Sequence, residues 1–260
     1  MKVLVTFALE TEFAPWRAMR RFRPAKWGQA EAFFAQIGAA EVGVVLTGVG
    51  PKQAATRAAQ VMRSDFDSVG LCISSGLAGA VRPAYQIAQV LAARTIRAED
   101  APERAEGGTL KSSDALLSFA EECGATPVGQ FYSASRVIGR AEEKQHIGHV
   151  ADAVEMESFE ILREAAAAGI PAIALRAISD LSTENLPLDM GDLLNSEGKV
   201  SIPRVVGQVA LHPTALPDLV KLGQNSKRAA ESLAQFLDRY IATVADRTAA
   251  LETRTTAATS

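Results

Sequence analysis

Residues Ala153–Asp180 constrain the fold of this chain more than any other stretch. They read AVEMESFEILREAAAAGIPAIALRAISD. Strong helix formers predict a helix over Ser158–Ala168, ended by Gly169 and by a proline just beyond it. Ala172–Ile178 is apolar except for one arginine, which is typical of a parallel strand buried on both faces. A helix followed directly by such a strand predicts an α/β domain with this strand in its central sheet.

Carboxylates stand at both ends of this stretch. Asp180 follows the predicted strand at its carboxyl end, where open α/β sheets bind their ligands. Glu155 and Glu157 are two residues apart, so in an extended segment both side chains point to one face, and we expect Glu157 to point inward. Singly, each acid is explained by a helix N-terminus or a loop cap. Their occurrence around one strand–helix–strand unit favours a functional site.

The motifs V-E-M-E-S and R-A-I-S-D occur in this order across a helix. This pairing resembles the signature of the nucleoside phosphorylase and nucleosidase superfamily, which includes methylthioadenosine/adenosylhomocysteine nucleosidases. The resemblance implies cleavage of the N-glycosidic bond of a purine nucleoside of the adenosyl type. It also implies that Asp180, with Ser179 beside it, delivers or shares a proton at purine N7, and that Met156 and Glu157 contact the ribose.

A second acidic cluster follows the predicted first strand, Val3–Leu9. Its two glutamates are explained equally well by the N-terminus of a short helix over Phe13–Arg21 and by a functional site. Nucleosidases of the methylthioadenosine type place a water-positioning glutamate here, and Glu12 occupies the matching position. The basic run R-A-M-R-R-F-R is interpreted as a solvated helix face, with phosphate binding as the second interpretation.

A glycine-bearing turn follows a predicted hairpin of Gln29–Ile37 and Val42–Thr47. Its sequence T-G-V-G-P-K-Q imitates the start of a dinucleotide-binding fingerprint, but Gln53 stands where the third glycine is required. We therefore reject a dinucleotide site. The turn is instead similar to one in the nucleosidase family.

Val69–Ser74 is a predicted buried strand that leads into a predicted glycine-rich loop over residues 75–80. Backbone without side chains approaches a ligand closely, although a tight structural turn explains the glycines equally well. The family resemblance places this loop beside the ribose and the nucleophile, with the candidate residues Ser75, Gly76, Leu77 and Gly79. Leu77 replaces the Ser or Thr often found there, which weakens a phosphate pocket.

Further strands are predicted over Gln86–Ala92 and Thr126–Tyr132, with a charged loop over 94–108 and a helix over Ser112–Cys123 between them. The sequence S-A-S-R-V-I follows, where family members hold the purine. The resemblance assigns Val137, Ile138 and Ser179 to the base. This chain departs from the nucleosidase pattern because it has Ser135 in place of an Asp and Val137 in place of a base-stacking Phe.

The C-terminal part is predicted to contain a loop-rich lid over Leu181–Leu222 and an amphipathic helix over Gln224–Val244. Its apolar segment, and the earlier run S-R-V-I-G-R-A-E-E-K, look like the hopanoid-associated phosphorylases of the same superfamily. We expect one nucleoside phosphorylase/nucleosidase domain over residues 1–246 and a disordered tail over 247–260.

The composition limits the possible fold, partners and location of the chain. With 260 residues, 48% of them hydrophobic, the chain can bury one large core, and we expect a three-layer α/β/α fold with a mixed central sheet. A net charge of −3 argues against a nucleic-acid partner, and no apolar run is long enough for a membrane span. Cys72 and Cys123 show no paired motif, which favours a cytoplasmic location. We expect a homodimer or higher homo-oligomer without metal or cofactor.

Three functions remain open from the sequence. The first is hydrolysis of the nucleoside by water that Glu12 activates. The second is phosphorolysis of the hopanoid-associated type, with phosphate as co-substrate and Arg17, Arg20 or Arg21 as phosphate partners. The third is a non-catalytic nucleoside-binding protein. An ionised Glu12 would repel a phosphate dianion, so the sequence favours hydrolysis.

Overall fold

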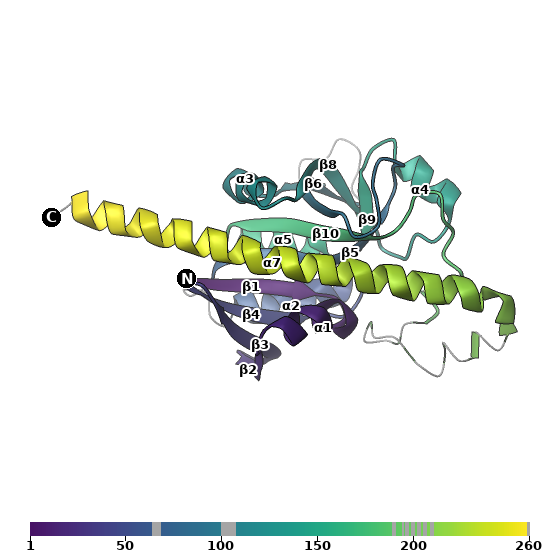
Figure 1. Cartoon of the computed structure of the whole chain (residues 1–260), viewed down its shortest axis with the longest axis horizontal. Coiled ribbons are helices and arrows are strands. Elements are labelled where there is room, and N and C mark those ends of the chain that lie inside the picture. The colour runs from purple at the N-terminus through teal and green to yellow at the C-terminus, as the bar shows by residue number, and fades with distance from the viewer. Residues whose placement is uncertain are drawn as a thin grey trace.

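The computed structural model describes residues 1–63, 69–99, 108–188, 191–193, 195, 198, 201, 204, 207–208 and 211–258, the last ten by their backbone only (Figure 1). The strands are β1 Lys2–Phe7, β2 Arg23–Trp27, β3 Ala30–Ile37, β4 Ala40–Leu46, β5 Val69–Ala80, β6 Val90–Ala98, β7 Thr109–Lys111, β8 Thr126–Ser133, β9 Ala153–Glu155 and β10 Ala172–Asp180. The helices are α1 Glu10–Met19, α2 Pro51–Met62, α3 Asp114–Glu122, α4 Ala141–Ile147, α5 Ser158–Ala167 and α7 Leu216–Ala258, which a short 3-10 turn, Pro213–Ala215, precedes.

The strands form a mixed sheet with a closed part and an open part. β1 lies between β4 and β5 and is parallel to both, and the antiparallel strands β3 and β2 continue beyond β4 to an open edge. On the other side, β5 pairs with β10 in parallel and with β9 antiparallel. Because β10 also pairs with β6, and β8 joins β6 to β9, these five strands close into a ring.

Helices cover both faces of the sheet, with α1, α3 and α7 on one side and α2 and α5 on the other (Figure 1). The alternation of side chains along β1 shows why. Val3, Val5 and Phe7 pack in the core that contains Trp16 of α1 and residues of α7, as expected for positions that share one face of a strand. Leu4 points to the opposite core, with α2 and α5. The predicted three-layer α/β/α fold with a mixed sheet is therefore confirmed.

The stretch Ala153–Asp180 folds as predicted. Helix α5 covers Ser158–Ala167, and Gly169 follows its end. Strand β10 is buried along its whole length and reaches two residues further than predicted, so that Asp180 is its last residue. The strand is parallel to β5 only, because its other neighbour, β6, runs antiparallel.

The predicted glycine-rich loop over residues 75–80 is wrong, because these residues continue strand β5. Their backbone is hydrogen-bonded to β10, with Gly76 opposite Arg176, and then to β9. These glycines do not form a turn. They allow the side chains of neighbouring elements to pack closely against the strand. A Cβ on Gly76, whose φ is +150°, would lie 3.3 Å from a Glu12 carboxylate oxygen, and a Cβ on Gly79 would lie 2.8 Å from Asp180 Oδ2.

Several predicted bounds near the N-terminus and in the middle of the chain also differ. Strand β1 ends at Phe7, and helix α1 begins at Glu10, so both acids of the second cluster lie in the first helical turn. The basic run predicted as a helix face ends in the edge strand β2, which pairs with β3. Strand β6 begins later than predicted and takes up part of the predicted charged loop, of which residues 100–107 lie outside the described residues.

Helix α7 is longer at both ends than predicted and crosses the face of the sheet (Figure 1). It is fixed there by an ion pair and a hydrogen bond: Arg20 Nε lies 2.7 Å from Asp238 Oδ1, and Tyr240 Oη donates to the Leu116 carbonyl at 3.1 Å. The helix passes the boundary at residue 246 and reaches Ala258. The division into a domain and a disordered tail stays a prediction, and residues 259–260 lie outside the described part.

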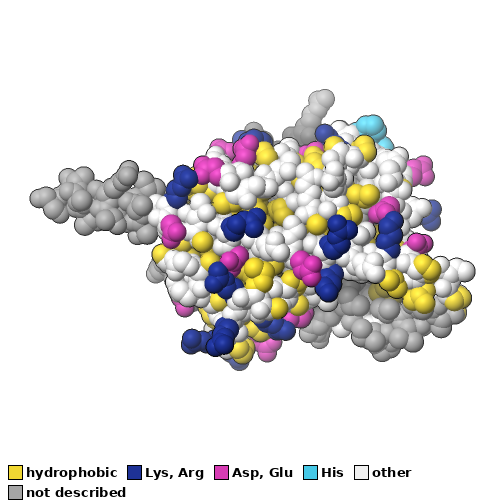
Figure 2. All heavy atoms as spheres, viewed as in Figure 1, with side chains coloured by type: hydrophobic (Ala, Val, Ile, Leu, Met, Phe, Trp, Pro, Cys, Tyr) yellow, Lys and Arg dark blue, Asp and Glu magenta, His cyan; other side chains and the backbone are white. Residues whose placement is uncertain are grey.

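Two further expectations concern the charge of the surface and the presence of membrane-spanning helices. On the face that α7 crosses, Lys and Arg side chains alternate with Asp and Glu side chains without a large basic area (Figure 2). Among the described residues, no helix combines the length and the apolar character needed to cross a bilayer.

Candidate active site

A cavity of about 170 Å³ lies at the carboxyl ends of β1, β5 and β10. Nine residues predicted as site residues from the sequence contribute to its lining: Glu12, Leu77, Gly79, Val137, Ile138, Met156, Glu157, Ser179 and Asp180. Ser75 and Gly76 were predicted as well but do not line it. Ser75 is buried, and its hydroxyl oxygen makes no hydrogen bond within the described part of the chain. The structure thus brings Glu12 together with Glu157 and Asp180, which belong to a distant part of the sequence, and Glu155 also lines the cavity.

Glu12 is held at the cavity by the start of its own helix. Its Oε2 accepts hydrogen bonds from the backbone N–H groups of Ala8 at 2.9 Å and Leu9 at 3.0 Å. Its Oε1 accepts one from Leu77 on β5 at 3.1 Å. Burial raises the pKa of this carboxyl above its ordinary value, against the lowering effect of these backbone donors. Glu12 therefore stabilises the helix N-terminus and also presents an ordered, buried carboxylate to the cavity.

Beneath the cavity lies a buried ion pair that the sequence analysis did not predict. Arg176 Nη2 on β10 lies 2.6 Å from Glu155 Oε2 on β9 and 3.8 Å from Glu157 Oε2. Glu155 Oε2 also accepts the backbone N–H groups of Glu157 and Ser158, at 3.0 and 2.7 Å. These bonds orient the turn from β9 into α5. The sequence signal for this pair was the single arginine in an otherwise apolar strand.

Glu157 points inward, as expected, and reaches the turn after β4. Its Oε1 accepts the backbone N–H of Gly50 at 2.8 Å. Burial, with the nearby charge of Glu155, raises the pKa of the Glu157 carboxyl to about 8, although the guanidinium of Arg176 opposes the rise. The Glu157 carboxyl therefore holds its proton to a higher pH than an exposed glutamate does.

Asp180 is held from both sides at the end of β10. Its Oδ1 accepts a hydrogen bond from Ser179 Oγ at 2.8 Å, and its Oδ2 accepts one from the ammonium group of Lys144 on α4. Lys144 is fully buried. The sequence analysis did not predict this residue, because a lysine in the charged run A-E-E-K is typical of a solvent-exposed helix position.

The wall formed by the S-A-S-R-V-I segment contributes Val137 and Ile138 to the cavity. Ser135, which replaces an acid of the nucleosidase pattern, points away to Glu99. Its N–H and hydroxyl groups both donate to Glu99 Oε2, at 2.8 and 2.5 Å. These two hydrogen bonds between Ser135 and Glu99 fix the loop between β8 and α4.

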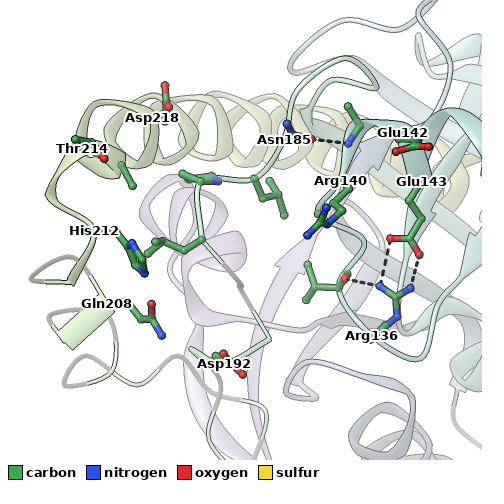
Figure 3. Close-up of a pocket in the computed structure, with 17 residues that line it drawn as sticks. Arg136, Arg140, Glu142, Glu143, Asn185, Asp192, Gln208, His212, Thr214 and Asp218 are labelled. Atoms are coloured by element: carbon green, nitrogen blue, oxygen red, sulfur yellow. Dashed lines mark hydrogen bonds and ion pairs between the residues drawn. The ribbon is translucent and has the colours of Figure 1, made fainter.

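A second cavity of about 1080 Å³ adjoins the first and shares Arg136, Val137 and Leu186 with it. Figure 3 shows its labelled side chains on α4 and the loop before it, on the segment after β10, and around the start of α7. Arg136 forms an ion pair with Glu143, and Asn185 Oδ1 accepts the backbone N–H of Ala141 at 2.8 Å. The site therefore opens into a space much larger than itself.

Two of the arginines considered as phosphate partners bind elsewhere. Arg17 Nη2 lies 2.7 Å from Glu10 Oε1, and Arg20 is paired with Asp238 of α7. Neither lines the cavity, and Arg136 is the only cation among its described lining residues. The described residues also contain no group of three or more His, Cys, Asp or Glu side chains placed to hold a metal ion.

A family model described as "Phosphorylase superfamily" matches residues 2–242. The chain belongs to the phosphorylase superfamily. A futalosine hydrolase from Streptomyces coelicolor is 29% identical over 158 residues, which cover 53% of this chain and 66% of that protein, just under two thirds of its length. The resemblance stated from the two motifs is thereby confirmed. The expectation of an enzyme of the nucleosidase or nucleoside phosphorylase class agrees with the name of this relative.

Solved structures of this superfamily share the fold. The methylthioadenosine/adenosylhomocysteine nucleosidase of Campylobacter jejuni has a TM-score of 0.71 at 18% identity, with 94% of this chain and 99% of that chain covered. The futalosine hydrolase of Helicobacter pylori has a TM-score of 0.70 at 18% identity, with 93% and 97% covered. At this identity, the likeness shows the common phosphorylase fold. The roles of the individual site residues stay predictions.

Proposed function

We propose that this chain hydrolyses the N-glycosidic bond of a purine nucleoside of the adenosyl type. The observation that carries the proposal is the convergence on one cavity of Glu12, from the start of the chain, with Glu157 and Asp180, from the stretch Ala153–Asp180. All three are buried, which is costly for carboxylates that serve only as surface caps. Buried carboxylates clustered in one cavity are typical of catalytic sites.

The roles follow from what the bond requires. Breaking the C1′–N9 bond leaves positive charge on the ribose and sends the bonding electron pair to the purine. Asp180 lines the cavity together with Val137 and Ile138, which we assign to the base. Its carboxylate takes up a proton from solvent and delivers or shares it at N7. Glu157 binds the ribose hydroxyls with the Met156 side chain packed beside it. The charge of an ionised Glu157 stabilises the developing cation.

Glu12 positions the attacking water. Both of its oxygens are fixed by backbone N–H groups, so the carboxylate does not have to be ordered when substrate binds. A pKa raised by burial makes it a stronger base for the water proton than an exposed carboxylate. The water oxygen then bonds to C1′ while its proton moves to Glu12.

Water is favoured over phosphate by the charges around the cavity. A bound phosphate dianion requires cations or several free donors. The single lining cation among the described residues, Arg136, is already paired with Glu143, and Arg17 and Arg20 bind other acids. An ionised Glu12 would repel a phosphate dianion placed beside it. Phosphorolysis of the hopanoid-associated type is therefore the alternative that our proposal rejects.

The large adjoining cavity supports a substrate that extends beyond the nucleoside itself. Its volume of about 1080 Å³ is several times that of the site, and the two share Val137 and Leu186. We therefore expect methylthioadenosine, with a small substituent, to be cleaved less efficiently than nucleosides with larger ones. Adenosylhomocysteine and futalosine, the compound in the name of the Streptomyces relative, are suitable comparisons.

Release of the free base from these three nucleosides tests the proposal. We expect release from at least one of them by the wild-type protein and by Glu10→Gln, because Glu10 is partly exposed, pairs with Arg17 and lies outside the cavity. Glu12→Gln should abolish it. A wild-type protein that binds a nucleoside but releases no base from any of the three would indicate a non-catalytic binding protein and would refute the proposal.

A further inference from the structure

We propose that Lys144 is a positioning residue that holds the Asp180 carboxylate for the purine base. This inference rests on the proposed function, because it gives Asp180 the role described above. Lys144 lies on α4, 36 residues before Asp180, and its side chain is completely buried. A buried ammonium group requires partners for its charge and its donors, so the groups around Lys144 indicate what it does.

Those surroundings satisfy an ammonium group completely. Its Nζ donates to Asp180 Oδ2, to the Leu181 carbonyl at 3.2 Å and to the Glu184 carbonyl at 3.1 Å. An ammonium group has three N–H donors and no acceptor, so all of its bonding capacity is used. The lysine thus has no donor left for a substrate and acts through Asp180.

The contacts also define what Lys144 does for Asp180. Its bond fixes one carboxylate oxygen, while Ser179 Oγ fixes the other at 2.8 Å. Its charge compensates a carboxylate that would otherwise stand close to Glu12 and Glu157 in one small cavity. With both oxygens held, the rotation of Asp180 is fixed before the base arrives, which lowers the cost of reaching the reactive geometry.

Lys144 also links Asp180 to the elements that line the larger cavity. Its own helix contributes Glu142 and Glu143 to the lining of that cavity. The Glu184 carbonyl that it binds belongs to the segment after β10, whose Glu184 carboxylate pairs with Lys221 of α7 at 2.7 Å. Lys221 is largely exposed and therefore provides a matched control.

A double-mutant cycle tests this assignment. Lys144→Met, Asp180→Asn and the double variant are compared for adenine affinity by calorimetry and for kcat/KM with the best nucleoside. We expect each single variant to lose at least about tenfold in both quantities, as a positioned proton-transfer group contributes at least that much. In the Asp180→Asn background, Lys144→Met should cost no more than about twofold further, because its partner is already gone. Lys144→Arg should restore part of the loss, and Lys221→Met should stay within about twofold of wild type.

The outcomes separate the two proposals. Losses that add in full, or a Lys144→Met protein equal to wild type, would overturn the role of Lys144. If Lys144→Met alone does not fold, the double variant, which removes both buried charges, is compared with Asp180→Asn, and a further large loss overturns the role in the same way. A non-additive cycle in adenine affinity without cleavage of any nucleoside would support the positioning role and refute the proposed hydrolysis.

Discussion

Arg176 Nη2 lies 2.6 Å from Glu155 Oε2 beneath the cavity, and this contact joins the middle of β10 to the end of β9. Both side chains are almost completely buried, so each depends on the other for compensation of its charge. The same guanidinium lies 3.8 Å from Glu157 Oε2. One arginine therefore orders the turn from β9 into α5, which carries Glu157, and favours the ionised form of this acid, which we assign to the ribose.

Replacing Arg176 should accordingly affect the whole protein. Arg176→Met leaves Glu155 and Glu157 together without a cation, and removal of one partner of a buried ion pair costs about 3–5 kcal/mol. We expect a large fall in the free energy of unfolding, measured by urea denaturation. Arg163→Met on the exposed side of α5 is the control, since its ion pair with Glu160 lies at the surface. Equal stability of the two variants would contradict the structural role of Arg176.

Glu157 should make stability depend on pH. Its pKa is raised from an ordinary 4.5 to about 8 in the folded protein, so between these values the folded state holds a proton that the unfolded state has lost. The stabilising contribution is complete below about pH 4.5 and disappears as the pH rises through about 8. We expect the melting temperature of wild type to fall over this window and that of Glu157→Gln to fall less. Parallel curves for the two proteins would contradict the raised pKa.

The same residue should affect binding and chemistry together. A group that contacts the ribose acts in the ground state and also on the cation of the transition state. Glu157→Gln is therefore expected to raise KM and to lower kcat for the best nucleoside, measured by steady-state kinetics of base release. An unchanged kcat and KM with every nucleoside cleaved would refute a role at the sugar.

Asp180→Asn should lower turnover by about 10²–10⁴-fold, because the amide cannot take up an acidic proton and pass it to N7 as the carboxylate does. It should also lower the melting temperature, since the buried ammonium of Lys144 then loses its charged partner. Thermal unfolding and base release measured on the same preparation separate the two effects. A folded Asp180→Asn protein with near wild-type turnover would exclude Asp180 as the acid.

Glu12→Gln should abolish hydrolysis but preserve binding of the base. An amide nitrogen at either position of the Glu12 carboxylate would face a backbone N–H donor, so at least one of three hydrogen bonds is lost. We expect a fall in kcat of about 100-fold or more, with adenine affinity within a factor of about three of wild type. If adenine affinity fell as steeply as kcat, the result would show that Glu12 contacts the base and does not position the attacking water.

Much of this site could be predicted from the sequence because its acids follow regular elements. Asp180 ends an apolar strand, and Glu157 begins a helix with unambiguous propensities, so their placement depends on local patterns. Lys144 could not be predicted in the same way. Its partner is 36 residues away, and only the tertiary packing of α4 on the end of β10 buries it.

The errors in the fold have a similar cause. Residues 75–80 were predicted as a loop because glycine is rare in strands, but here β10 and β9 pair with this segment and Glu12 approaches Gly76 closely. Tertiary contacts thus override the local preference. Strand β2 was missed because four of its five residues are exposed and show no alternation, so only its pairing with β3 marks it as a strand.

The most direct test of the central claim is the identity of the sugar product. The wild-type protein is incubated with its best nucleoside with and without inorganic phosphate, and the sugar is analysed by mass spectrometry. Our account predicts the free 5′-substituted ribose at a rate that phosphate does not raise. A ribose 1-phosphate product, formed at a rate that increases with phosphate concentration, would contradict it and would require another role for Glu12.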